Sequence, residues 1–211
     1  MFRQALLEQG FAPDKLSPMG EVEGQIRSEE LDAEHEARRR AALALVRQYP
    51  DPVLRMKANE VADFDDSVTS LVERMTALME EARGVGLAAP QLGVLRRVLV
   101  YRTAEEDPVV ALVNPRVVET GEETETSEEG CLSLGAATVV VEVERATAVT
   151  VEGSSPEGEP LRVEADGLQA RVIQHELDHL DGVLTIDRTT PEQRKGALAQ
   201  LRPQPVLGPV G

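Results

Sequence analysis

The sequence predicts an α+β fold in which antiparallel or mixed sheets pack around one buried helix. We also expect a helical extension at the N-terminus and another helix at the C-terminus. Segments rich in β-branched residues follow one another between residues 94 and 163, with turn signals between them. Residues 166–182 then form a helix whose apolar side chains surround much of its circumference, a pattern typical of a buried helix.

The first 45 residues are expected to form an extension outside the main domain. Residues 1–27 mix glycine, proline and charged residues without a clear period, which favours a loosely held segment. Ser28 can cap a helix with an acidic first turn and basic later turns, an order that suits the helix dipole. That helix must end before Pro50, and residues 43–46 also suit a strand.

Two more helices are expected beyond this extension. From Asp65 onwards, apolar residues recur at spacings of three and four, and Gly84 is placed to end the helix as its C-cap. A last helix should begin near Pro191 and cover residues 192–201, because proline is favoured at the first helical position.

The predicted strands alternate with turn signals. Residues 119–129 hold six glutamates and no basic residue, so we expect a solvated loop or sheet edge there. Pro115 is expected to close the strand before it. The strands predicted in this part of the chain are Val94–Arg102, Val109–Val113, Thr138–Val143, Thr147–Val151 and Leu161–Val163.

The composition indicates which partners are disfavoured and in which compartment we expect the protein. The formal net charge of −16 disfavours non-specific binding to DNA or to an anionic membrane, and no stretch approaches the roughly 20 apolar residues of a membrane helix. Aromatic residues make up 2% of the chain, so the core must be aliphatic. Cys131 is the only cysteine, which excludes an internal disulfide and fits a reducing compartment. With no apolar signal-peptide region, we expect a cytoplasmic protein.

The buried helix carries the pattern H-E-x-x-H. His175 and His179 are four residues apart, so both rings lie on one helix face, and Glu176 lies beside them. Buried polar groups need partners, and a metal ion would supply them. Cys131 offers a third ligand after Gly130, and three ligands with one open position are typical of a catalytic site. A helix with exposed polar residues, and a cysteine acting as a small core residue, remain the alternatives.

Three short stretches, in chain order, resemble the signature motifs of the peptide deformylases. They are Gly84–Gln91 (GVGLAAPQ), Glu129–Ser133 (EGCLS) and Gln174–Leu180 (QHELDHL). Residues 49–55 also resemble the opening turn of that family, and the likeness covers about residues 46–187. It divides the chain into an extension (1–45), a catalytic domain (46–187) and a C-terminal helix and tail (188–211).

The resemblance implies a metal-dependent hydrolase that removes the formyl group from formyl-methionine of nascent polypeptides and releases formate. Fe(II) is the metal it implies first, with Zn, Ni or Co able to occupy the same site. The metal activates a water molecule as the nucleophile. The residue roles it implies are metal ligands Cys131, His175 and His179, general acid/base Glu176, oxyanion donors Gln91 and the Leu132 N–H, and substrate contact at Gly86. The neighbouring apolar side chains Val85, Leu87 and Leu134 are candidates for the lining of a methionine pocket. Gly130 is a further candidate for substrate contact.

Further charged residues are candidates for supporting roles. Glu129 and Asp178 could accept hydrogen bonds from the histidine rings, with Arg145 as their counter-charge, while surface salt bridges remain the alternative. The sequence departs from the family between Leu134 and Val139, where an arginine that helps to hold the peptide is common. The effect of this loss on peptide preference stays open.

Two other functions remain as alternatives, a zincin-type peptidase and a metal-binding relative without catalysis. Cys131 and the loop ending at Gln91 disfavour the first, and retention of Glu176 disfavours the second. From residue 188 onwards the chain has four basic residues and one acidic residue. This locally basic tail is a candidate for contact with ribosomal RNA, or simply a solvated face.

Overall fold

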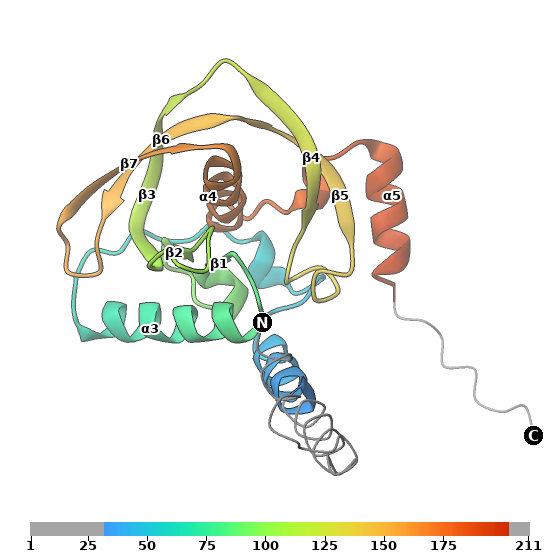
Figure 1. Ribbon diagram of the computed structural model, residues 1–211, viewed down its shortest axis with the longest axis horizontal. Helices are drawn as coiled ribbons and strands as arrows, with labels where there is room; N and C mark the ends of the chain where they lie inside the picture. The colour runs from blue at the N-terminus through green and yellow to red at the C-terminus, as the bar shows by residue number, and fades with distance from the viewer. Residues whose placement is uncertain (1–31, 203–211) are drawn as a thin grey trace, which may run out of the picture. The chain divides into compact units, whose positions relative to one another are not determined.

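The computed structural model describes residues 32–202, and the chain divides into two compact units, residues 1–38 and 39–211. Within the first unit, the described residues 32–38 are helical. The expected cap at Ser28 and the loosely held segment 1–27 lie outside the described residues. The second unit is α+β with antiparallel sheets, as the sequence predicts (Figure 1).

The larger sheet of the second unit has five antiparallel strands in the order β1-β2-β3-β6-β7. Both faces of β2 are covered, because Val98 and Val100 join a core cluster with α3 while Leu99 and Tyr101 join another with α4. This explains the uninterrupted apolar run in β2. The strands are β1 (Gly86–Ala88), β2 (Val98–Tyr101), β3 (Val110–Thr120), β6 (Ala148–Ser154) and β7 (Pro160–Asp166).

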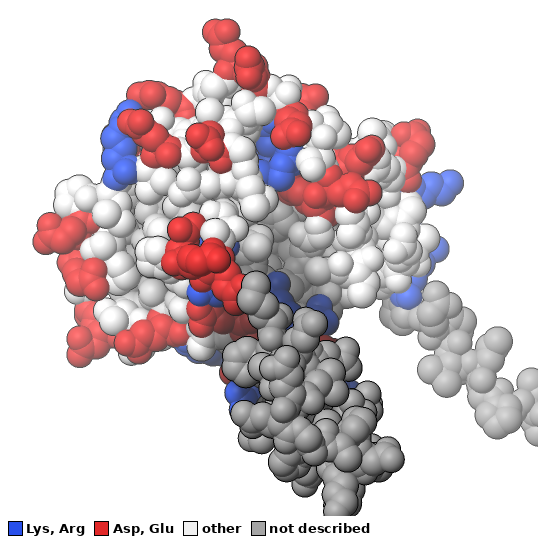
Figure 2. Space-filling model, in the orientation of Figure 1, with Lys and Arg blue, Asp and Glu red and all other residues white. Residues whose placement is uncertain are grey.

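A separate two-stranded sheet is formed by β4 (Thr124–Gly130) and β5 (Val140–Ala146). Of the two expectations for residues 119–129, the sheet edge is confirmed and the loop holds only between Thr120, where β3 ends, and Thr124, where β4 begins as one strand of this two-stranded sheet. Burial alternates from residue to residue at the end of β4, as it does in a strand: Glu129 is buried, whereas its neighbours Glu128 and Gly130 are exposed. On the face shown in Figure 2, acidic side chains cover more of the surface than basic ones, in patches separated by uncharged residues.

Helix α4 (Gly167–Leu180) lies between the five-stranded sheet and the β4–β5 hairpin (Figure 1). Ala170, Ile173 and Leu177 pack against strands of the larger sheet. α3 (Asp66–Glu81) covers β1 and β2 from the other side, and α5 (Pro191–Gln200) packs along β5. Three short 3-10 helices complete the unit: η3 (Pro52–Arg55), η4 (Ala89–Leu92) and η5 (Thr185–Asp187).

Several element boundaries differ from the sequence predictions; β2, for example, begins at Val98 rather than at Val94. Residues 43–46 continue a helix and then turn rather than form a strand. α3 has Ala82 as its C-cap, and Arg83 takes the left-handed conformation (φ 57°) expected of Gly84. β3 passes through Pro115, because one extra residue between Val113 and Arg116 forms a bulge where the missing N–H is not needed.

The described helices include none that is both long and apolar enough to span a membrane. The core is aliphatic as composition requires; its largest fully buried side chains, within the described residues, are Leu, Met, Ile and one histidine, His179. A histidine among such residues needs a polar partner.

Candidate active site and metal centre

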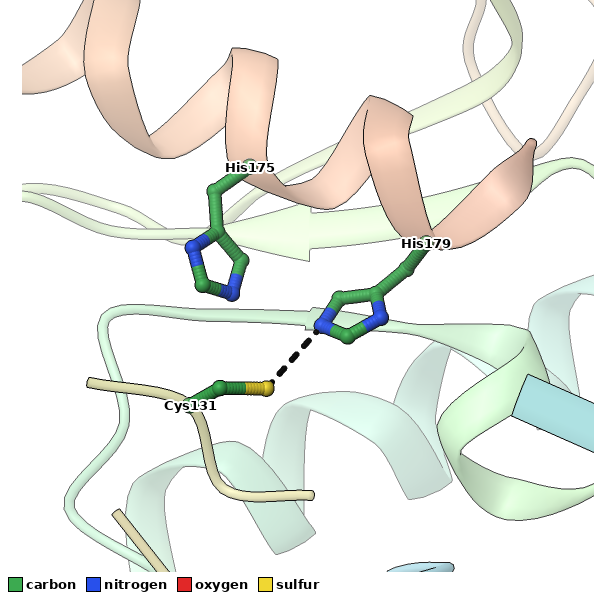
Figure 3. Close-up of side chains that lie close together, drawn as sticks. All are labelled: Cys131, His175 and His179. Carbon is green, nitrogen blue, oxygen red and sulfur yellow. Dashed lines mark hydrogen bonds between the residues drawn. The ribbon is translucent and has the colours of Figure 1, made fainter. Parts of the chain in front are cut away.

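Three side chains with metal-ligating atoms converge beside α4. Cys131, His175 and His179 offer donor atoms that all lie within 4.8 Å of one another. The two histidines stand one turn apart on α4, and Cys131 reaches toward them from the loop directly after β4 (Figure 3). The Cys131 sulfur lies 3.2 Å from Nε2 of His179, and the ring centroids of the histidines are 5.1 Å apart.

This donor set suits a divalent metal ion with one open coordination position. One thiolate and two imidazoles are ligands for zinc, iron and related ions, and a purely structural site would have a fourth protein ligand. Within residues 32–202, Oε2 of Glu176 is one of the buried atoms that have no hydrogen-bond partner. Because such atoms are costly to leave unpaired, a group bound beside the three donors would complete the site.

Glu176 is placed to exchange a proton at this centre. Its side chain is buried, and burial raises the pKa of its carboxyl to about 7, although the nearby charges of His175 and Arg145 lower it. Gly86 makes room for this carboxylate, because a Cβ at residue 86 would lie 2.5 Å from Oε1 of Glu176. The glycine of β1 is therefore required by the position of the acid.

The two histidines lie in different electrostatic surroundings. Burial lowers the pKa of His175, but hydrogen bonds with Cys131 and Glu129 outweigh this effect and raise the pKa well above its usual value. Burial, followed by the nearby charges of His175 and Arg145, lowers the pKa of His179 well below its usual value. The negative groups around His175 thus favour a cation at this point, and a metal ion would replace the ring proton.

A buried ionic network orients His175. Oε2 of Glu129 lies 3.0 Å from Nδ1 of His175, which leaves Nε2 to face the centre. Arg145 binds Glu129 through two bonds of 2.6 and 2.9 Å and Asp178 through a third of 2.9 Å. Burial raises the pKa of Glu129, but hydrogen bonds from His175 and Arg145 outweigh it and lower the pKa to about 2.

Gln91 lies against the loop that contains Cys131, and Leu132 follows Cys131 in that loop. Gln91 is 2% exposed, and its Oε1 accepts a hydrogen bond of 2.8 Å from the Ala88 N–H. Its Nε2 donates to Oγ of Ser133 at 3.2 Å and lies 3.9 Å from the Cys131 sulfur. The side-chain amide is therefore fixed with its N–H donors toward the ligand loop.

A cavity of about 260 Å³ opens onto these groups. Val85, which is half exposed, and Leu132 give it apolar walls, and Arg83 and Glu128 place charges on its lining. A larger hollow of about 870 Å³ beside β3, β6 and β7 contains none of the three donors. The smaller cavity is the one that leads to the chemistry.

A family model described as "Polypeptide deformylase" matches residues 43–195. The chain belongs to this family. Peptide deformylase 1 of Corynebacterium efficiens is 46% identical over 159 residues, which cover 74% of this chain and 93% of the relative. A peptide deformylase of Natranaerobius thermophilus is 44% identical over 147 residues, covering 70% and 92%.

Solved structures of peptide deformylases are also similar to this chain. A peptide deformylase of Synechococcus elongatus in complex with actinonin superposes with a TM-score of 0.70 at 38% identity, covering 74% of this chain and 85% of that one. The peptide deformylase of Thermotoga maritima gives 0.65 at 44% identity, covering 69% and 97%. The activity of the chain is accordingly the metal-dependent removal of N-terminal formyl groups from polypeptides.

Most residues singled out in the sequence meet at the centre of this deformylase. The three ligand candidates form the donor cluster, and Cys131, His175 and Glu176 are among the residues that line the cavity. The other predicted residues in the cavity lining are Val85, Gly86, Gln91, Gly130 and Leu132. Leu87 and Leu134 are fully buried in two core clusters and are not among the lining residues.

The sequence did not predict that two arginines bind the buried acidic residues beside the metal centre. Arg171, one turn before His175 on α4, donates to Glu129 at 2.8 Å and to the carbonyls of Val143 and Glu125. Arg188 binds Asp178 through bonds of 2.6 and 3.1 Å. The spacing of Arg171 four residues before His175 was the available signal, since both side chains share one helix face.

Proposed function

We propose that this deformylase acts on formyl-methionine at the N-terminus of nascent polypeptides, with Cys131, His175 and His179 as metal ligands. Glu176 serves as the general acid/base. The observation that carries the proposal is the convergence of three metal-ligating atoms within 4.8 Å beside one buried carboxyl group of raised pKa. General bases are effective when their pKa lies near neutral pH, and burial raises the pKa of Glu176 in that direction.

Fe(II) is the ion we propose, with Zn, Ni or Co able to occupy the same three ligands. A divalent ion there supplies Lewis acidity and a water molecule that is acidic near neutral pH. Ligand chemistry alone does not choose among these ions, because a thiolate and two imidazoles accept several of them. Metal analysis of protein purified without oxygen tests the choice, and iron at about one atom per chain is the expected result.

Glu176 carries the proton through the reaction. Its unpartnered Oε2 accepts the proton released by water, and the same carboxyl returns it to the amide nitrogen that leaves with the peptide. Burial keeps the protonated form accessible, so both transfers occur near neutral pH. Gly86 leaves the space that this carboxylate occupies.

Gln91 and the Leu132 N–H stabilise the negative oxygen that develops on the formyl carbon. The bond from the Ala88 N–H fixes the Gln91 amide so that its Nε2 donors face the Cys131 loop. Loss of one such donor typically lowers the rate by ~10²–10³. This fixed orientation supports a catalytic role for Gln91 rather than a packing role.

The peptide is proposed to lie in the 260 Å³ cavity, against the backbone of Gly86 and Gly130 and beside Val85. Leu87 supports the wall of this pocket from the core behind β1. The absence of a side chain at both glycines lets an extended chain approach closely. Because the chain lacks the arginine that is common after Leu134 in the family, its preference for peptide residues that follow the methionine should be measured.

The remaining proposals concern the whole chain. We assign residues 46–187 to the catalytic domain, residues 1–45 to an extension, and residues 188–211 to a C-terminal helix and tail. A lone reduced cysteine suits action in the cytoplasm. Ribosome contact through the C-terminal region would rest on Lys195 and Arg202, because Arg188 and Arg194 already bind acidic side chains. Reversing both charges should then weaken ribosome co-sedimentation, most strongly at low salt.

One assay tests the activity itself. Formate release from a formyl-Met peptide is measured with apoprotein to which Fe(II), Zn(II), Ni(II) or Co(II) has been returned. Release that depends on the ion supports the proposal. Cleavage of internal peptide bonds would point to a peptidase instead, and no turnover with any ion would leave a binding protein.

A further inference from the structure

The segment Arg47–Tyr49 lies against the residues that form the oxyanion side of the centre. The Arg47 N–H donates to the carbonyl of Gln91 at 2.7 Å, and the Tyr49 N–H donates to the carbonyl of Ser133 at 2.9 Å. Between these two backbone bonds stands the side chain of Gln48. Three consecutive residues outside the three signature motifs thus hold the segments that contain Gln91 and Leu132.

The amide of Gln48 bridges both ends of the turn that follows Cys131. Its Nε2 donates to the carbonyl of Leu132 at 2.8 Å and to that of Val46 at 3.3 Å. Its Oε1 accepts a hydrogen bond from the Ala136 N–H at 3.3 Å. A single side chain therefore ties Leu132 to Ala136 across the turn.

This turn has an unfavourable backbone. Gly135, Ala136 and Ala137 all have positive φ, at 60°, 55° and 65°. Two of them are alanines, whose Cβ disfavours the left-handed region, so the conformation persists only where surrounding bonds over-determine it. The Gln48 bond to the Ala136 N–H is one of those bonds.

Hydrogen bonds fix the backbone on both sides of the Leu132 Cα, and Gln48 supplies one of them. The peptide plane before Leu132 contains the Cys131 carbonyl, which accepts bonds of 2.9 Å from the N–H groups of Leu134 and Ala137. The plane after Leu132 contains the carbonyl held by Gln48. Both planes that flank the Leu132 Cα are therefore fixed, one by the turn itself and one by Gln48.

We propose that Gln48 is a positioning residue that aims the Leu132 N–H at the oxyanion by holding the 132–136 turn. The inference rests on the proposed function, in which the Leu132 N–H is an oxyanion donor. Gln48 itself touches neither substrate nor metal ligand in this assignment. Its effect should consequently fall on the rate of the chemical step rather than on substrate binding.

The main variant is Gln48→Met, which removes all three hydrogen bonds of the side-chain amide at similar volume. Because complete loss of an oxyanion donor costs ~10²–10³ in rate, a misdirected donor should lower kcat about tenfold. KM should stay within about twofold, and bound metal per chain should not change. Backbone amide exchange of residues 132–137 should accelerate, an effect that is measured without turnover.

The matched control is Asn114→Gly. Asn114 also uses its amide to bind backbone at both ends, to the N–H and the carbonyl of Val61 at 2.8 Å each, and glycine suits its φ of 53°. This variant should lose stability while kcat stays at the wild-type value. A Gln48→Met, Ala136→Gly double variant should recover kcat severalfold, because glycine relieves the left-handed strain in the turn.

The outcomes separate cleanly. A fall in kcat with normal KM and metal content, partly rescued by Ala136→Gly, supports the proposal. Unchanged kcat in Gln48→Met, with a loss of stability like that of Asn114→Gly, would overturn it, as would unchanged amide exchange in the turn. A wild-type protein that releases no formate with any ion would instead defeat the proposed function, while accelerated exchange in Gln48→Met would still show that Gln48 holds the turn.

Discussion

Replacing Arg145 with alanine should weaken both the fold and the metal centre. Arg145 is 95% buried and makes three charge-assisted bonds, two to Glu129 and one to Asp178. Breaking a buried ion pair by removing one partner costs ~3–5 kcal/mol. Glu129 keeps Arg171 and His175, and Asp178 keeps Arg188, so the lower end of about 3 kcal/mol applies here.

This loss is large enough to measure directly. For a chain of this size, about 3 kcal/mol lowers the unfolding midpoint by about 6–12 °C. Because Glu129 also orients His175, metal affinity should fall by about 10–100-fold, as measured by competition with a chelator. Arg116→Ala is the matched control, since its pair with Glu152 is exposed and screened by solvent and should contribute little to stability. If Arg145→Ala behaves like this control and releases metal at the wild-type rate, the network has no role at the centre.

Three further outcomes are expected. Gly86→Ala should lower kcat by ~10² or more at normal metal content, because the new Cβ would displace the Glu176 carboxylate; wild-type kcat would refute the close contact. Chelation should abolish formate release and lower the thermal midpoint, and returning the ion should restore both, since a ligand bound only to the folded state stabilises it. Burial raises the pKa of Asp187, but hydrogen bonds from Arg55 and from the backbone outweigh it and lower the pKa. Asp187→Asn should therefore be less stable than wild type above pH ~4, and the difference in unfolding free energy should shrink as pH falls below that value; a difference independent of pH would contradict this.

The residues of the metal centre could be predicted from the sequence, because the local geometry of a helix determines much of their arrangement. Helical spacing alone predicts that His175 and His179 share a face, and α4 confirms it. The convergence of Cys131 needed the resemblance, because 44 positions separate it from the nearer histidine along the chain. The α+β class was also predictable, since apolar periods of two and of about four mark strands and helices.

The rest depended on long-range contacts that no local pattern records. The β4 strand could not be predicted because its buried position holds a glutamate rather than an apolar residue. Arg145 and Arg171, which come from other elements, form the ion pairs that compensate for the burial of Glu129. β3 continues past Pro115 because a bulge removes the need for its N–H. The bonds of Gln48 join residues 84 and 88 positions apart, so the sequence offers no signal for them.

The central claim is that Glu176 moves the proton at a metal centre built by Cys131, His175 and His179. The most direct measurement is formate release by Glu176→Gln beside wild type, with bound metal quantified in the same samples. Full metal occupancy with kcat reduced by ~10²–10⁴ is the predicted result, since general acid–base catalysis contributes that much. Turnover of the fully loaded variant within a few-fold of wild type would contradict the account.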